Sequence, residues 1–170
     1  LYWQEAPRRI GCSDSAALDA VFEMLVRAGR DAPMAKTMLI PESWSKQTVD
    51  LPKPWIDMYS YCNSVMEPWD GPAAMAFSDG KKIGATLDRN GLRPARYFVL
   101  DDDTVVLASE AGTLPFDQSR VVKKWRLQPG KMLLIDTEKG KIISDEERKV
   151  LARAMDCLCP PERDIPRSDN

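Results

Sequence analysis

The sequence predicts an α+β fold in which helices come first and antiparallel strands follow. Apolar residues recur at the spacing of one helix face just after Ser13. Further along the chain the period changes, and two short apolar segments flank Asp79-Gly80, a dipeptide typical of β-hairpins. Two more polar turns follow, at Asp101–Asp103 and Glu138–Gly140, each between segments rich in Val, Ile and Leu.

The first predicted helix covers residues 15–28. Ser13-Asp14-Ser15 offers three residues that are favoured at a helix N-cap. Gly29 follows the last periodic residue and suits a left-handed C-terminal cap. The apolar face of this helix consists of Leu18, Val21, Phe22, Leu25 and Val26.

A second helix is predicted to start at Asp31, with Pro33 in its first turn, and to stop before Pro41. The polar segment Glu42–Asp50 is expected to be a loop.

Pro52 and Pro54 then suit the first turn of a third helix, which is expected to end at Glu67-Pro68. Its apolar positions recur every three or four residues, at Trp55, Tyr59, Cys62 and Met66.

Seven strands are predicted after the helices, with an additional turn at Asn90-Gly91. A closing helix over Glu146–Met155 would be capped by Ser144 or Asp145. The predicted strands are Ala73–Ser78, Lys82–Leu87, Arg96–Leu100, Thr104–Ser109, Val121–Leu127, Lys131–Asp136 and Lys141–Ile143.

The composition excludes several classes of function. The 170 residues carry 24 basic and 26 acidic side chains, and this balance argues against an electrostatic nucleic-acid binder or a polybasic membrane surface. No histidine is present, which excludes Ser–His–Asp and Cys–His catalysis within this chain and histidine-ligated zinc. The four cysteines are too few and too unevenly spaced for a secreted disulfide scaffold, so we expect a cytoplasmic location and no metal site. They are Cys12, Cys62, Cys157 and Cys159.

Five stretches contain combinations of residues that ordinary core packing does not explain. In chain order they are Gly11–Asp19, Met38–Glu42, Met66–Ala73, Leu87–Tyr97 and Leu127–Gly130. Together they resemble the glutamine amidotransferase domain of glutamate synthase large subunits, continuously over about residues 13–147. The Met-Glu-Pro-Trp-Asp-Gly-Pro stretch favours glutamate synthase over the amidophosphoribosyltransferases, which share the class II domain and a looser version of Leu87–Tyr97.

The resemblance implies a four-layer αββα fold of the N-terminal-nucleophile hydrolase type. In that family an N-terminal cysteine attacks the side-chain amide of L-glutamine, and its own α-amino group handles the proton. An Asn-Gly pair forms the oxyanion hole. Ammonia then passes through a tunnel to a flavin site, where 2-oxoglutarate becomes glutamate.

The cofactors and partners are implied by the same resemblance. No cofactor is expected in this chain, whereas FMN and an iron–sulfur cluster are expected in other domains of the parent protein. The expected partners are L-glutamine, the upstream and downstream domains of the same polypeptide and a small electron-donating subunit. Neither nucleic acid nor a membrane is expected.

The start of the chain departs from the family pattern. It begins with Leu1 instead of cysteine, and the family places its nucleophile, its carboxylate-binding arginine and its oxyanion pair before the Ser-Asp-Ser motif. We therefore expect residues 13–147 to be the C-terminal part of the domain and the chain alone to be inactive. Residues 1–12 form a non-matching segment, and residues 148–170 are expected to be a helix end and a disordered tail.

Two residues are candidates for substrate binding, and none is a catalytic candidate. By resemblance, Asp14, supported by Ser13, accepts the α-ammonium group of glutamine. An ammonium group requires an acceptor-only partner at fixed geometry, which a carboxylate at the start of a rigid helix provides. The alternative is a capping acid that the helix dipole stabilises by about 0.3–1 kcal/mol.

Other residues with suggestive chemistry have simpler explanations. Asn90-Gly91 lies on the wrong side of Ser-Asp-Ser to be the oxyanion pair and is better explained as a turn. Cys12 lacks a histidine partner, and Asp101–Asp103 lacks the ligand spacing of a calcium loop. The arginines at 89, 93 and 96 are expected to pair with acids or cover the sheet, and Trp55 and Trp69 to anchor the core.

Two other functions remain open on the sequence alone. The chain could belong to another class II amidotransferase of the amidophosphoribosyltransferase type. It could also be a non-catalytic interaction module.

Overall fold

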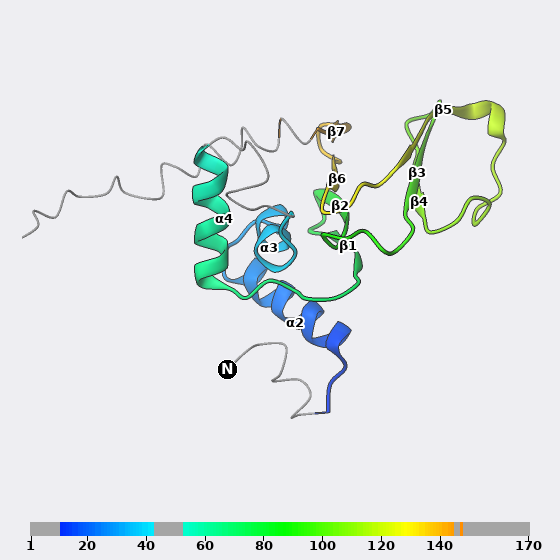
Figure 1. Cartoon of the computed structure of the whole chain (residues 1–170). Coiled ribbons are helices and arrows are strands. Elements are labelled where there is room, and N and C mark those ends of the chain that lie inside the picture. The colour runs from blue at the N-terminus through cyan, green and yellow to red at the C-terminus, as the bar shows by residue number, and fades with distance from the viewer. Residues whose placement is uncertain (1–10, 43–52, 145–146, 148–170) are drawn as a thin grey trace, which may run out of the picture.

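The computed structural model describes residues 11–42, 53–144 and 147, and its three helices precede all of its strands, as predicted (Figure 1). The helices are α2 (Asp14–Arg27), α3 (Ala32–Leu39) and α4 (Lys53–Val65). The observed bounds lie within two residues of the predictions for α2, and Pro54 is in the first turn of α4. The predicted loop Glu42–Asp50 and Pro52 lie outside the described residues, apart from Glu42.

Side chains from just outside the helices fix their ends. The Ala16 N–H donates to Ser13 Oγ at 3.2 Å, and the Met34 N–H donates to Asp31 Oδ1 at 2.9 Å. At the end of α2, Gly29 has φ +89° and its N–H donates to the Val26 carbonyl. This left-handed residue forms a Schellman-type cap, so the chain can turn directly into α3.

In the described part of the chain, seven strands form two antiparallel sheets. One sheet has the order β1-β2-β6-β7, and the other has the order β4-β3-β5. The strand bounds are β1 Ala74–Ser78, β2 Lys82–Leu87, β3 Arg96–Leu100, β4 Val105–Ala108, β5 Val121–Arg126, β6 Met132–Asp136 and β7 Lys141–Ile143, with a 3₁₀ turn η1 at Gln118–Arg120. All seven predicted strands are confirmed, and the three predicted hairpins join β1 to β2, β3 to β4 and β6 to β7.

The helices and the two sheets form three successive layers (Figure 1). Because side chains alternate along a strand, β6 serves both faces of its sheet. Met132 and Leu134 pack with Phe77 and Ala32 on the helix side. Leu133 packs with Tyr97 of the second sheet and with Leu127, which follows β5, on the opposite side. The mixed helix and antiparallel-sheet architecture therefore agrees with the predicted α+β class.

A separate helical cluster holds α2, α3 and α4 together. Met38, Leu39 and Cys62 are fully buried at its centre, and Leu18 and Leu25 of α2 pack against them. Every residue of α3 is buried, including Lys36. The helix is therefore an internal element, enclosed by α2, α4 and the first sheet.

The predicted closing helix lies almost wholly outside the described residues. Of its predicted caps, Ser144 is described, and the Glu147 N–H donates to Ser144 Oγ at 3.2 Å while Glu147 Oε2 accepts from the Ser144 N–H at 3.1 Å. This reciprocal pair is a capping box. Within the described parts of the chain, no helix combines the length and apolar character needed to cross a bilayer.

Candidate functional site

Ser13 and Asp14 occupy the start of α2, and the structure separates their roles. Ser13 is the N-cap residue, with extended backbone angles of φ −74° and ψ 155°. Asp14 is the first residue of α2 and is exposed, and the N-cap residue is Ser13. It still lies where the helix dipole favours a carboxylate. Its proposed contact with a substrate ammonium group stays a prediction.

The core of α2 orders the backbone that carries this carboxylate. Ala17 and Leu18, one turn further along, are buried, and Leu18 belongs to the helical cluster that includes α3. The Ala17 N–H donates to the Ser13 carbonyl at 3.0 Å. The first turn is thus ordered by a cap on one side and by buried side chains on the other, as a binding carboxylate requires.

Asp88 organises the turn that carries Asn90-Gly91. Its carboxylate is buried, and Oδ1 accepts from the Ala73 N–H at 3.1 Å. Oδ2 accepts from the N–H groups of Asn90 (3.0 Å) and Gly91 (3.1 Å). Gly91 has φ +60°, and a Cβ atom there would lie 2.5 Å from Pro129 Cγ. The Asn90-Gly91 pair is therefore a structural turn, as predicted.

The stretches that carried the family resemblance meet around this turn. The Gly130 N–H donates to the Asp88 carbonyl at 2.9 Å, which joins the Leu127–Gly130 stretch to the Leu87–Tyr97 stretch. The Trp69 N–H donates to the Leu39 carbonyl at 2.6 Å, which joins Met66–Ala73 to Met38–Glu42. These motifs lie far apart in the sequence and form one connected region of backbone hydrogen bonds.

Lys36 and Glu42 complete this region from the side of α3. The Lys36 Nζ atom, which is fully buried, donates to the Gly130 carbonyl at 3.0 Å. A Cβ atom on Gly130 would lie 3.2 Å from the Glu42 Cα atom, so only glycine fits without displacing the chain. Glu42 also pairs with Lys131 at 3.5 Å. The region is tightly packed and has the character of a scaffold.

The remaining candidates have structural roles. Arg89 pairs with the exposed Asp70 at 3.0 Å, as expected of an arginine near acids. Arg120 holds both Asp101 (2.9 Å) and Asp102 (2.6 Å) at the hairpin tip, which explains these acids without calcium. Across the described part of the chain, no group of three or more His, Cys, Asp or Glu side chains could hold a metal ion. Trp55 and Trp69 are both half-buried.

The two described cysteines do not resemble activated nucleophiles. Cys62 is fully buried in the helical cluster, and burial raises the pKa of its thiol to about 11. Such a thiol is protonated at neutral pH and is a poor nucleophile. Cys12 is exposed before α2. Cys157 and Cys159, where no metal site was predicted, lie outside the described residues.

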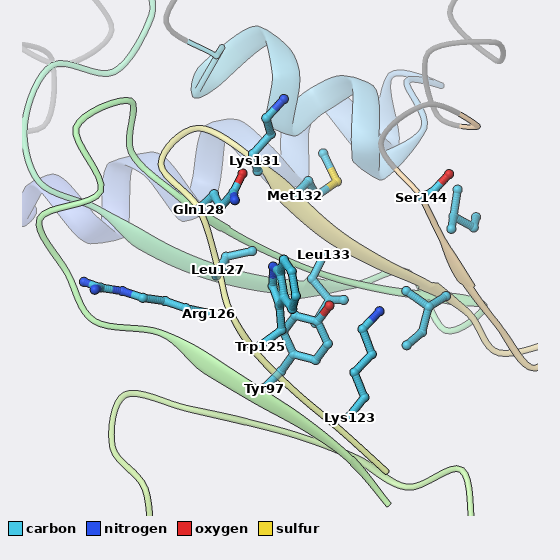
Figure 2. Close-up of a pocket in the computed structure, with 12 residues that line it drawn as sticks. Tyr97, Lys123, Trp125, Arg126, Leu127, Gln128, Lys131, Met132, Leu133 and Ser144 are labelled. Atoms are coloured by element: carbon cyan, nitrogen blue, oxygen red, sulfur yellow. The ribbon is translucent and has the colours of Figure 1, made fainter. Parts of the chain in front are cut away.

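Sequence reasoning missed a groove between the two sheets. It measures about 530 Å³ and is lined by twelve residues from β3, β5, β6, β7 and the segments beside them (Figure 2). Tyr97 and Trp125 lie side by side in Figure 2, with Lys123 next to them. The basic and aromatic run in β5 was the available signal, but it could be interpreted only once β5 was known to face β6 and β7.

The family profile for "Glutamine amidotransferases class-II" matches residues 8–156. The chain therefore belongs to the class II glutamine amidotransferases, in agreement with the resemblance carried by its motifs.

Within that family, its relatives are glutamate synthases. The chain is 56% identical over 137 residues to the glutamate synthase [NADPH] large chain of Bacillus subtilis, covering 81% of this chain and 9% of that protein. It is 49% identical over 142 residues to the corresponding large chain of Azospirillum brasilense, with 82% and 9% covered. A ferredoxin-dependent chloroplastic glutamate synthase of Oryza sativa is 48% identical over 139 residues, with 81% and 9% covered. The chain thus spans about a tenth of the length of these relatives.

Proposed function

We propose that this chain is part of the glutaminase domain of a glutamate synthase. The domain releases ammonia from L-glutamine, and the parent protein uses that ammonia to convert 2-oxoglutarate into glutamate by reduction. The observation that supports this proposal most strongly is the region around Asp88, where four of the five family-like stretches are joined by hydrogen bonds.

Asp14 is the proposed partner of the substrate α-ammonium group. Asp14 lies in the exposed first turn of α2, where the Ala16 N–H donates to Ser13 Oγ. A carboxylate can accept several N–H bonds from an ammonium group. The buried residues beneath it limit its movement, which reduces the entropy lost when glutamine binds.

We further propose that the chain alone does not hydrolyse glutamine. Acyl transfer requires an activated nucleophile, a base and an oxyanion hole in one place. Cys62 is buried as a neutral thiol, the Asn90-Gly91 pair is engaged in a turn, and the sequence contains no histidine. Ammonia release that vanished on Cys12→Ser would contradict this proposal.

The two sheets and the helices fit three layers of the expected αββα fold, and we propose that a fourth layer covers the outer face of β4-β3-β5 in the parent protein. We place the flavin and iron–sulfur chemistry in other parts of that protein, as the family resemblance implies. The small number and uneven spacing of the cysteines favour a cytoplasmic location for the protein.

Isotope labelling of the complete parent protein distinguishes this function from its alternatives. With an electron donor supplied, we expect amide-¹⁵N glutamine and 2-oxoglutarate to give ¹⁵N in the α-amino group of newly formed glutamate. Label that appeared instead in a phosphoribosyl amine, when phosphoribosyl pyrophosphate is also supplied, would favour the amidophosphoribosyltransferase type. Glutamine left unconsumed by a folded parent protein would favour a non-catalytic interaction module.

A further inference from the structure

The Asn90-Gly91 pair carries a chemical reactivity of its own. In a flexible chain, the backbone nitrogen that follows an asparagine attacks the side-chain amide carbon, expels ammonia and closes a succinimide ring. Glycine in the second position favours this attack, because it has no side chain to obstruct the approach. Water then opens the ring to aspartate or isoaspartate. This reaction makes Asn90 a candidate site of spontaneous modification.

The fold requires the glycine of this pair. Gly91 has φ +60°, and a Cβ atom there would lie 2.5 Å from Pro129 Cγ, so a larger residue does not fit without displacing the ring. Asn90 is exposed, and its side-chain amide forms no hydrogen bond with any residue that the structure describes. The amide carbon is therefore accessible, and a restraint on the reaction has to act on the Gly91 nitrogen.

Asp88 holds that nitrogen through two acceptors. The Gly91 N–H donates to the Asp88 carbonyl at 3.0 Å and to Asp88 Oδ2 at 3.1 Å. To attack, the nitrogen must lose its proton and rotate about the Cα–C bond of Asn90 toward the side chain, which breaks both hydrogen bonds. The negative charge of the carboxylate also opposes the loss of the proton, since two negative charges would then lie next to each other.

Other segments hold Asp88 itself in place. Asp88 is 2% exposed, and its Oδ1 atom accepts from the Ala73 N–H at 3.1 Å. Its backbone carbonyl also accepts from the Gly130 N–H at 2.9 Å. Asp88 is therefore not free to follow Gly91 when the turn moves, and release of the Gly91 N–H requires a local opening of the connected region.

We propose that Asn90 is a latent deamidation site, which Asp88 keeps unreactive while the turn is closed and which opening of the turn converts irreversibly. In the open turn a bond forms between the Gly91 nitrogen and Asn90 Cγ, the Cγ–Nδ2 bond breaks, and Nδ2 leaves as ammonia. Water then cleaves one of the two ring C–N bonds. Cleavage at Cγ gives aspartate, and cleavage at the main-chain carbon gives isoaspartate. The reaction needs no cofactor and no glutamine, and each chain undergoes it once.

Neither product fits the closed turn as asparagine does. Aspartate at position 90 adds a negative charge beside the Asp88 carboxylate, which accepts from the N–H of the same residue at 3.0 Å. Isoaspartate lengthens the main chain by one carbon atom and displaces the Gly91 N–H from its acceptors. The modification therefore marks chains in which the Asp88 region has opened, and it hinders the region from closing again.

The test compares the 170-residue chain with a synthetic peptide of residues 86–95 in mildly alkaline ¹⁸O water. Peptide mass spectrometry follows the incorporation of ¹⁸O at residue 90 as deamidation proceeds. We expect the folded chain to react at least about tenfold more slowly than the peptide, because the Gly91 N–H first has to leave a charged acceptor. Amide hydrogen exchange at Gly91, measured by NMR, reports the same opening, and deamidation should be suppressed at least as strongly as exchange.

Two variants separate local opening from loss of the whole fold. Asp88→Ala should speed deamidation of Asn90 at least about tenfold, with Asp88→Asn as a milder variant if the first does not fold. Leu134→Ala removes a core side chain that is 2% exposed and leaves every contact of Asp88 in place. At a temperature where circular dichroism shows both variants to be folded, Leu134→Ala should react much more slowly than the Asp88 variant.

A third variant supplies a control within the folded chain. Asp70→Asn places an asparagine before Gly71, whose N–H donates to no residue that the structure describes. The side chain at position 70 is 84% exposed in the parent chain. The new asparagine should therefore react faster than Asn90 in the same molecule.

Three results would overturn the proposal. Deamidation of Asn90 in the folded chain at the rate of the peptide would show that Asp88 does not restrain it. Equal acceleration by Asp88→Ala and Leu134→Ala would mean that the reaction follows loss of the whole fold. In the Asp70→Asn variant, equally slow reaction at positions 70 and 90 would mean that the folded chain suppresses deamidation in general, without a specific role for Asp88.

Discussion

Replacing Asp88 should destabilise the fold far more than replacing another aspartate of the same region. The Asp88 side chain is buried and accepts from the N–H groups of Ala73, Asn90 and Gly91. The Gly91 N–H is shared with the Asp88 carbonyl at 3.0 Å, so two N–H groups depend on the carboxylate. Each donor left unsatisfied costs about 1–3 kcal/mol, and Asp88→Ala should therefore cost about 2–6 kcal/mol.

Asp88→Asn tests the bond to Ala73 separately from the bonds to the Asn90-Gly91 turn. An amide has one acceptor oxygen and one donor NH₂ group, so it can keep either the bond to Ala73 or the bonds to the turn. We expect a loss of about 1–3 kcal/mol, which is the cost of one unsatisfied donor. Urea unfolding followed by circular dichroism gives the free energy of unfolding for each variant.

The matched control is Asp70→Asn. Asp70 pairs with Arg89 at the surface, with 84% of its side chain exposed, and such pairs contribute little. Its unfolding midpoint should stay close to that of the parent. If Asp88→Asn were as stable as Asp70→Asn, or if Asp88→Ala cost under about 1 kcal/mol, the hydrogen-bond account of this region would be refuted.

Three further predictions concern single residues. Gly91→Ala should destabilise the chain more than Gly112→Ala in thermal unfolding, because both have positive φ but only the first would place a Cβ atom against a proline ring; equal losses would mean that the ring moves aside. In a variant with serine at 157 and 159, a thiol reagent at pH 8 should modify Cys12 rapidly and Cys62 only on unfolding, because burial raises the Cys62 pKa to about 11; rapid labelling of both would contradict the buried site. Hydrogen bonds from the neighbouring threonine and from an arginine lower the pKa of Asp102 to about 2, so its contribution to stability is present above about pH 4 and is lost as the pH falls toward 2. Asp102→Asn should remove this pH dependence of the unfolding midpoint between about pH 4 and pH 2. An unchanged pH dependence would show that Asp102 does not pair with Arg120 in solution.

Local chemistry made the helices and hairpins predictable. Asp31 and Gly29 act within a few residues of their own position, so their capping roles could be inferred from neighbouring residues alone, whereas Ser13 could be given only as one of three N-cap candidates. The hairpin strands were also adjacent in sequence. The crossover that places β6 beside β2 was not predicted, because it depends on which apolar faces meet after the chain collapses.

The residues around the candidate site were likewise only partly predictable from the sequence. Asp14 could be selected from its motif, whereas the burial of Lys36 could not, since a lysine in an amphipathic segment is usually expected at the surface. Its Nζ atom is accommodated because the carbonyl of Gly130 is brought to it from 94 residues away. The groove beside β5 was likewise invisible until Trp125 and Tyr97 were known to be cross-strand partners.

The central claim is that the carboxylate of Asp14 binds the α-ammonium group of glutamine, and one kinetic measurement tests it directly. In the complete parent enzyme, Asp14→Asn keeps the size of the side chain and the Ser13 cap but removes the charge. If bound glutamine buries this carboxylate, breaking one side of the resulting ion pair costs about 3–5 kcal/mol, so the KM for glutamine should rise about 100-fold or more, while the lost helix-dipole interaction costs only about 0.3–1 kcal/mol of stability. The matched variant Asp19→Asn removes an exposed charge from the same helix and should leave KM within about twofold. A KM for Asp14→Asn equal to that of the parent enzyme would contradict the assignment and reduce Asp14 to a favourable charge at a helix start.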